Sequence, residues 1–322
     1  MFLPGSADPV ALDRAMREAL ADSLEHIQAT VGTRLNLPGP ETLAAIAAVR
    51  SHRVAPGAFG RYYKTVLAIE DGDLAQARQR MIELVRMVRQ EPRFTICVYA
   101  DAALGDETAL YGDIVNPDSN APPWIAAPIS ADGFEQRVRE ALDLIDTADP
   151  ALAGELRGLL IQVVGAAPSG ASGAMAFGSV SSLMLWGLVV MNMERYATAA
   201  DLVQGLVHEA AHLLLYAHSI DEPLVTNPLS ERYKSPLRAD PRPMDGIIHA
   251  TFVSARMHYV NARLRAATSA SFAPIPPKEL DDRLATLREL YFGGVRTVRE
   301  HGQLTATGRR ILEESLDYMT AA

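Results

Sequence analysis

Residues 199–217 read AADLVQGLVHEAAHLLLYA, and this stretch decides both the fold class and the candidate site. It has the composition of a buried helix, with His208, Glu209 and His212 at its centre. Because an α-helix turns about 100° per residue, the two histidines lie roughly 40° apart on one face, one turn from each other. Two imidazoles in this arrangement can hold one metal ion, and Glu209 beside them can act on a water at that ion. The HExxH pattern therefore predicts a metal-binding helix.

The composition limits what the rest of the chain can be. Its 322 residues, 48% hydrophobic and 21% charged, are typical of a globular protein. The net charge of −9 argues against nucleic acid or an anionic membrane as a partner. Cys97 is the only cysteine, so a disulfide framework and a cysteine zinc site are excluded. We read no signal peptide in MFLPGSADPV, and the longest apolar run, 183–190, is too short to span a membrane. We expect a cytoplasmic protein.

The first 91 residues are predicted to form an all-helical module. Apolar residues recur at helical spacing in four segments, 9–30, 41–50, 59–70 and 73–90. The arginines of the fourth segment are expected to form a solvated face. Three roles of this module stay open: binding a leader sequence, covering the catalytic part, or forming a homodimer.

The sequence changes character at Pro92, and residues 92–322 are predicted to form a zincin-like metal-binding catalytic domain. Strands are expected at 94–99, 159–164 and 183–191, with an edge strand at 124–129 and a loop at 101–120. Helices are expected at 132–146, 244–266, 277–300 and 307–319, and the prolines of 221–243 predict an ordered loop. A small sheet followed by a metal-binding helix is the order of a zincin-like domain. The predicted fold class is α+β, mainly helical.

Two histidines do not complete a catalytic metal site, and several residues could add the third ligand. His218 occupies the place of the third histidine in the metzincin pattern, but Leu215 stands where that pattern has a helix-breaking glycine. If the helix continues, His218 points away from His212. Glu222 and Glu231 would be the gluzincin alternative, and both lie in the proline-rich segment.

His249, on the next predicted helix, is the favoured third ligand. It heads an apolar face, and Asp245 one turn earlier can orient its ring, as ligating histidines usually require. His258 falls about 180° from His249 on that helix, so the two cannot face the same ion.

Two arginines precede this helix in the segment SPLRADPRP, residues 235–243. The fork of a guanidinium matches a carboxylate with two parallel hydrogen bonds. Arg238 and Arg242 are therefore candidates for binding a carboxylate-bearing co-substrate or peptide group.

The blocks LVHEAAH (206–212) and ERYKSPLRADPRPMDGIIHA (231–250) resemble the HExxH-containing peptide-modification proteins of bacterial gene clusters for ribosomally synthesised, modified peptides (RiPPs). The resemblance covers residues 179–260, and the second block is its more specific part. It implies a zincin fold turned to oxidation: a non-haem Fe(II) dioxygenase that uses 2-oxoglutarate to hydroxylate side chains of a precursor peptide, commonly at the β-carbon. It also implies that His208, His212 and His249 hold the iron, and that Arg242, or failing that Arg238, pairs with the distal carboxylate of 2-oxoglutarate.

The ligand set leaves the metal open between iron and zinc. Three imidazoles leave three positions of Fe(II) for an oxo acid and oxygen, but such oxygenases usually use two histidines and one carboxylate. Three histidines and a water are equally a catalytic zinc site. The alternative function is thus a zinc metallopeptidase with Glu209 as general base. A third is a non-catalytic zincin-like scaffold that binds a peptide, which the intact HExxH disfavours.

Overall fold

A computed structural model describes residues 2–116, 123–169, 177–235, 240–269 and 273–322. Within them, eleven α-helices accompany five short strands that form a small mixed sheet, so the mainly helical α+β class is confirmed. The chain forms two compact units. Unit 1 contains Met1–Pro9, Gln136–Gly158 and Ala197–Ala322, and unit 2 contains Val10–Glu135 and Leu159–Tyr196.

The sheet belongs to unit 2. Strands β1 (Thr95–Val98), β3 (Gln162–Pro168) and β5 (Leu188–Asn192) pair in parallel in the order β1-β3-β5. β4 (Ser179–Ser181) adds antiparallel to β5, and β2 (Ile125–Ala126) pairs antiparallel with β3. β5 is buried along its whole length, as expected of a central strand with an almost continuous apolar sequence. The strands predicted at 94–99, 124–129 and 159–164 are present as β1, β2 and β3, although their first and last residues differ from the prediction.

The strand predicted at 183–191 is wrong in its first half. A 3₁₀ turn, η2 (Leu183–Leu185), precedes Gly187, which has φ +84. A Cβ at Gly187 would lie 2.7 Å from side-chain atoms of Ile161, so the chain needs a glycine to turn closely past this residue. The apolar run is therefore a turn followed by β5.

The loop predicted at 101–120 is also wrong, because α5 (Glu107–Val115) lies within it. One side of α5 buries Leu110, Tyr111 and Val115 in the core beside the sheet. Its first residue, Glu107, forms an ion pair with Arg61 of α3 (Pro56–Glu70). These contacts stabilise a helix of nine residues that was too short to be predicted from its own sequence.

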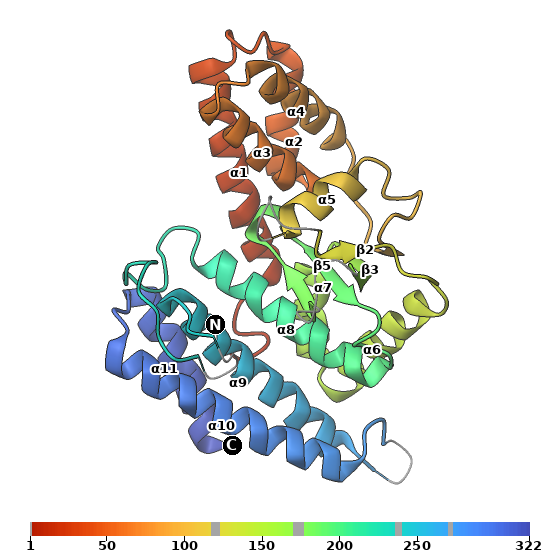
Figure 1. The fold of residues 1–322 in the computed structure, drawn as a ribbon, viewed down its shortest axis with the longest axis vertical. Coiled ribbons are helices and arrows are strands. Elements are labelled where there is room, and N and C mark those ends of the chain that lie inside the picture. Colours follow the sequence, from red (N-terminus) through yellow and green to blue (C-terminus); the bar gives the residue numbers. More distant parts are fainter. Residues whose placement is uncertain (1, 117–122, 170–176, 236–239, 270–272) are drawn as a thin grey trace. The chain divides into compact units, whose positions relative to one another are not determined.

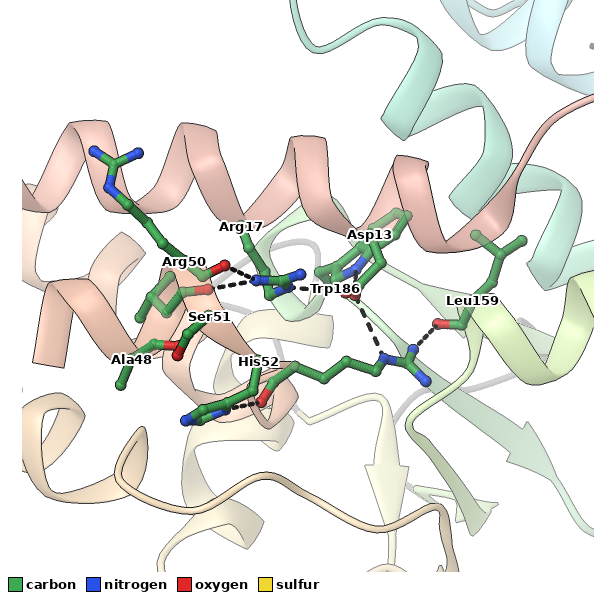
Figure 2. A network of polar contacts seen from close by, with 10 residues as sticks. Asp13, Arg17, Ala48, Arg50, Ser51, His52, Leu159 and Trp186 are labelled. Carbon is green, nitrogen blue, oxygen red and sulfur yellow. Dashed lines mark hydrogen bonds and ion pairs between the residues drawn. The ribbon is translucent and has the colours of Figure 1, made fainter.

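The four helices expected before residue 91 are confirmed as α1 (Pro9–Val31), α2 (Gly39–Ser51), α3 and α4 (Leu74–Met87). A buried polar network connects α1 to the end of α2 and to the segment before β5 (Figure 2). Asp13 accepts hydrogen bonds from Arg17 Nε at 2.9 Å and from Trp186 Nε1 at 3.0 Å. Arg17 also donates to the carbonyls of Val49 and Arg50, each at 2.7 Å. The helices of residues 10–91 thus belong to the same compact unit as the sheet.

Unit 1 is built from helices. α6 (Phe134–Ala148), which begins two residues before this unit, and α7 (Pro150–Leu159) precede α8 (Ala199–His218), α9 (Met244–Ala267), α10 (Pro277–His301) and α11 (Ala306–Ala321). Of these only α7 was not predicted. α9 contacts α8, α10 and α11, and Figure 1 shows α9 and α10 running side by side. Among the described residues of 221–243 the chain forms no helix, as predicted.

No helix in the described parts of the chain is both long and apolar enough to cross a membrane. The strands lie in unit 2 and α8 in unit 1, so the zincin-like domain stays a prediction.

Candidate metal centre

α8 begins with a reciprocal cap that fixes its first turn. The hydroxyl of Thr198 accepts from the backbone N–H of Asp201 at 3.1 Å, and the Asp201 carboxylate accepts from the backbone N–H of Thr198 at 3.3 Å. This capping box starts an apolar helix that continues unbroken through the HExxH sequence to His218. Because no break occurs at Leu215, the local condition for a metzincin-type third ligand is not met.

A pair of amides fixes α8 against α9. Gln204 and Asn261 exchange two hydrogen bonds, at 3.0 and 2.9 Å, one helical turn before His208. Each amide both donates and accepts, and Asn261 Nδ2 also donates to the carbonyl of Met257 at 2.7 Å, so the pairing fixes the register of the two helices. That register places the histidine face of α8 opposite His249 of α9.

The three predicted histidines lie in contact. Nε2 of His208 is 3.2 Å from Nε2 of His212, and Nδ1 of His212 is 3.1 Å from Nδ1 of His249. The ring centroids of His212 and His249 are 5.4 Å apart, in a stacked arrangement. The structure therefore brings together the residues from the two helices, with His212 in the middle.

The fit of this cluster to a metal ion can be tested on its distances. Two nitrogens 3.2 Å apart, each about 2.1 Å from one ion, subtend about 100° at that ion, between octahedral and tetrahedral values. His208 and His212 thus fit a shared ion. His249 faces the other nitrogen of His212, and among the described residues no group of three or more His, Cys, Asp or Glu side chains has a metal-holding arrangement. The nitrogens of His208 and His212 thus converge as a pair of possible metal ligands, and the ring of His249 contacts His212 on its other side.

The surroundings keep two of the rings neutral, which is the form that binds metal. Burial lowers the pKa of His212 to about 3, and the neighbouring His208 adds to the effect. Burial alone lowers the pKa of His249 to about 4. Tyr216, one turn after His212, covers both rings, with centroids 6.3 Å from His212 and 5.6 Å from His249. Its own pKa is raised by burial to about 12.

Two carboxylates lie beside these rings. Oε1 of buried Glu209 is 3.9 Å from Nε2 of His208, the nitrogen that faces His212. Oδ1 of Asp245 is 3.8 Å from Nε2 of His249, so Asp245 lies near the ring it was predicted to orient. Burial raises the pKa of Asp245.

The rejected ligand candidates have other surroundings. Glu222 accepts from the backbone N–H of Thr307 at 3.0 Å, and Glu231 accepts from the hydroxyl of Tyr233. His258 Nδ1 lies 2.9 Å from the hydroxyl of Tyr318. None of these contacts belongs to the cluster of His208, His212 and His249.

Of the two predicted arginines, the structure describes Arg242. Arg238 lies outside the described residues. Arg242 Nε is 2.9 Å from Oδ2 of Asp240, and its backbone exchanges hydrogen bonds of 2.8 and 2.9 Å with Tyr233. The Nε side of the guanidinium is thus paired with an exposed carboxylate.

Two residues at the cluster were not predicted from the sequence. Tyr216 follows His212 by four positions, so helical spacing alone places it on the histidine face. Met257 Sδ lies 3.4 Å from Nδ1 of His208. That contact depends on how α9 packs against α8, and the sequence carries no local signal for it.

Comparison with models of known protein families and with curated protein sequences gave no match to this chain.

Proposed function

We propose that this protein is a metal-dependent enzyme, a non-haem Fe(II)/2-oxoglutarate-dependent hydroxylase acting on side chains of a ribosomally synthesised precursor peptide. The observation that supports metal binding most directly is the 3.2 Å separation of the Nε2 atoms of His208 and His212. The choice of iron, 2-oxoglutarate and peptide rests on the RiPP-cluster resemblance of residues 206–212 and 231–250. His208 and His212 would hold the ion, with His249 as the third ligand.

The chain's own residues have definable roles in this reaction. When bound, Fe(II) and 2-oxoglutarate supply the oxidising power to insert one atom of O₂ into a C–H bond. Neutral His212 and His249 offer nitrogen lone pairs without first losing a proton, because burial disfavours their charged forms. Asp245 orients the ring of His249, and Tyr216 shields the rings of His212 and His249 from water. Arg242 would bind the distal carboxylate of 2-oxoglutarate.

A zinc metallopeptidase is the second candidate, and the position of Glu209 favours it. This carboxylate is buried and lies 3.9 Å from the nitrogen of His208 that faces the second ligand. In a peptidase, Glu209 would accept a proton from the attacking water and pass it to the leaving amine.

Metal content and product analysis distinguish these functions. We expect the purified protein to bind about one equivalent of Fe(II), to form succinate from 2-oxoglutarate, and to add the mass of one oxygen atom to a peptide encoded nearby. His212→Ala should lose metal binding and turnover, while His26→Ala, which removes an exposed histidine of α1, should keep both.

Other outcomes would contradict the proposal. Zinc-dependent cleavage of a peptide without oxygen, abolished in Glu209→Gln, would show the peptidase instead. Full metal binding by His212→Ala would remove the basis for both enzymes. If the protein bound a peptide but neither bound metal nor turned over a substrate, the remaining function would be that of a non-catalytic scaffold.

A further inference from the structure

The face of α9 opposite His249 lines a cavity. His258 follows His249 by nine residues, which places it about 180° around the helix. The cavity has a volume of about 540 Å³, within the range of small-molecule sites, and its lining comes from α9, α10 and α11. All of these residues belong to unit 1.

Two arginines from different helices give the cavity its charge. Nε of Arg263 in α9 is 3.2 Å from a carboxylate oxygen of Asp149, and half of the Arg263 side chain is exposed. Nη1 of Arg288 in α10 donates to the carbonyl of Met319 at 2.8 Å, and its guanidinium lies 5.1 Å from the centre of the Phe292 ring. A guanidinium has five N–H groups. The ion pair of Arg263 with Asp149 and the hydrogen bond of Arg288 to Met319 each involve one nitrogen of the guanidinium.

The other side chains of the lining carry no charge, and they are partly aromatic and partly apolar. His258 Nδ1 contacts the Tyr318 hydroxyl at 2.9 Å, and the two rings meet edge to face. Burial and, second, Arg288 lower the pKa of His258, while burial raises that of Tyr318 to about 12, so both are neutral near pH 7. Leu284 and Ala285 of α10 add apolar walls, and exposed Ala322 completes the lining. Among the described residues that line the cavity there is no aspartate or glutamate.

We propose that this cavity is a second binding site, which takes a small organic carboxylate with an apolar body. Arg263 and Arg288 bind the carboxylate, because a guanidinium fork matches its two oxygens. Tyr318, Leu284 and Ala285 contact the apolar body. Inorganic phosphate would satisfy the arginines but leave these walls uncovered, so the lining favours the carboxylate. The site is independent of the histidine cluster and of the function proposed for it.

Calorimetric titration of the full-length protein tests this inference, with phenylacetate and inorganic phosphate as separate probes. We expect saturable binding of one phenylacetate per chain and much weaker binding of phosphate. Arg263→Gln and Arg288→Gln should each weaken phenylacetate binding roughly tenfold, as expected for a lost charge-assisted contact. Arg309→Gln removes the same charge from an exposed position of α11 that does not line the cavity, and should change nothing.

Controls separate a lost site from a lost fold or a different site. Arg288 also holds the end of α11, so thermal melting must show that its variant is folded; Arg263, half exposed, is the safer position. The double variant His208→Ala with His212→Ala should keep phenylacetate affinity. The inference is overturned if phenylacetate does not bind at millimolar concentration or phosphate binds as tightly. It is equally overturned if neither arginine variant weakens binding, or if the double histidine variant abolishes it.

Discussion

Replacing Asp13 by alanine should destabilise unit 2 by about 3 kcal/mol. The Asp13 side chain is 3% exposed and balances the charge of Arg17, whose side chain is 7% exposed. Removing one partner of a buried ion pair costs about 3–5 kcal/mol, because the other charge remains buried. Trp186 would also lose the acceptor of its indole N–H, at about 1–3 kcal/mol. These costs are not additive. Arg17 keeps two backbone carbonyls, so we expect the lower end of the range.

Tryptophan fluorescence during urea unfolding is the suitable assay. The chain has two tryptophans, Trp124 and Trp186, and both lie in unit 2. Asp13→Asn keeps an oxygen for the indole N–H but loses the charge, so its loss should be smaller than that of Asp13→Ala. Asp22→Ala is the matched control, because Asp22 is on the same helix and pairs with Arg50, but its side chain is 70% exposed. Exposed pairs contribute about 0–1 kcal/mol.

A loss below about 0.5 kcal/mol in Asp13→Ala would refute this account of the network. Equal losses in the alanine and asparagine variants would also contradict it, since they would show that the acceptor for the indole N–H of Trp186 contributes nothing to stability.

Three further predictions concern unit 1. Glu155→Gln should lower the free energy of unfolding by about 3 kcal/mol, because the Glu155 and Arg256 side chains are each 1% exposed and the charge of Arg256 would stay buried without its partner. Urea unfolding followed by circular dichroism measures this loss, and an unchanged midpoint would contradict it. Gly294→Ala should lower the melting temperature, since its new Cβ would lie 2.1 Å from Oγ1 of buried Thr251 and force α10 away from α9; unchanged melting would show that the helices adjust freely. For metal-free protein, the lowered pKa of His249 means that the unfolded chain takes up a proton at this residue first, so its contribution to stability is full above the usual pKa of 6.5 and falls by about 3 kcal/mol as the pH drops to about 4. His212 and His218, whose pKa values are also lowered by burial, add falls of their own. Urea titrations at several pH values should therefore show a smaller fall in His249→Gln than in the unchanged protein, and an equal fall would contradict this.

All helices except α5 and α7 were predictable, because each of them carries its own signal. Apolar spacing marks the buried face, and side-chain caps mark several ends, such as Thr198 before α8 and Asp73 before α4. These interactions are local in sequence, so their pattern can be recognised without knowing the packing. For α9, which is buried on nearly all sides, the prediction depended on length and composition instead.

The errors occurred where distant contacts decide the local structure. α5 depends on burial against the sheet and on the pairing of Glu107 with Arg61, 46 positions earlier. Gly187 divides an apolar run into a turn and a strand because Ile161 lies against it. In both places the residues of the segment are compatible with the predicted and with the observed structure. The contact that selects the observed one comes from a residue far away in the sequence.

The candidate site also combines contacts that are local in sequence with contacts between distant residues. One helical turn brings His208 and His212 together, whatever the rest of the fold. The contact of His212 with His249 spans 37 positions and requires the pairing of α8 with α9. The ion pair of Arg242 with Asp240 is local, and its two-residue spacing was visible in the sequence.

The polar residues of α9 show how specifically this helix holds the histidine cluster. Other buried polar side chains on this helix have specific partners: Arg256 pairs with Glu155, Asn261 with Gln204, and Thr251 and Ser254 donate to carbonyls of their own helix. His249 instead presents Nδ1 to a second imidazole nitrogen, with a carboxylate oxygen at 3.8 Å on its other side. Two facing nitrogens of neutral imidazoles form a hydrogen bond when one of them carries the ring's hydrogen, so Nδ1–H of His212 can donate to Nδ1 of His249. In that tautomer Nε2 of His212 keeps its lone pair and lies 3.2 Å from Nε2 of His208, which is the arrangement that an ion shared by these two rings would need.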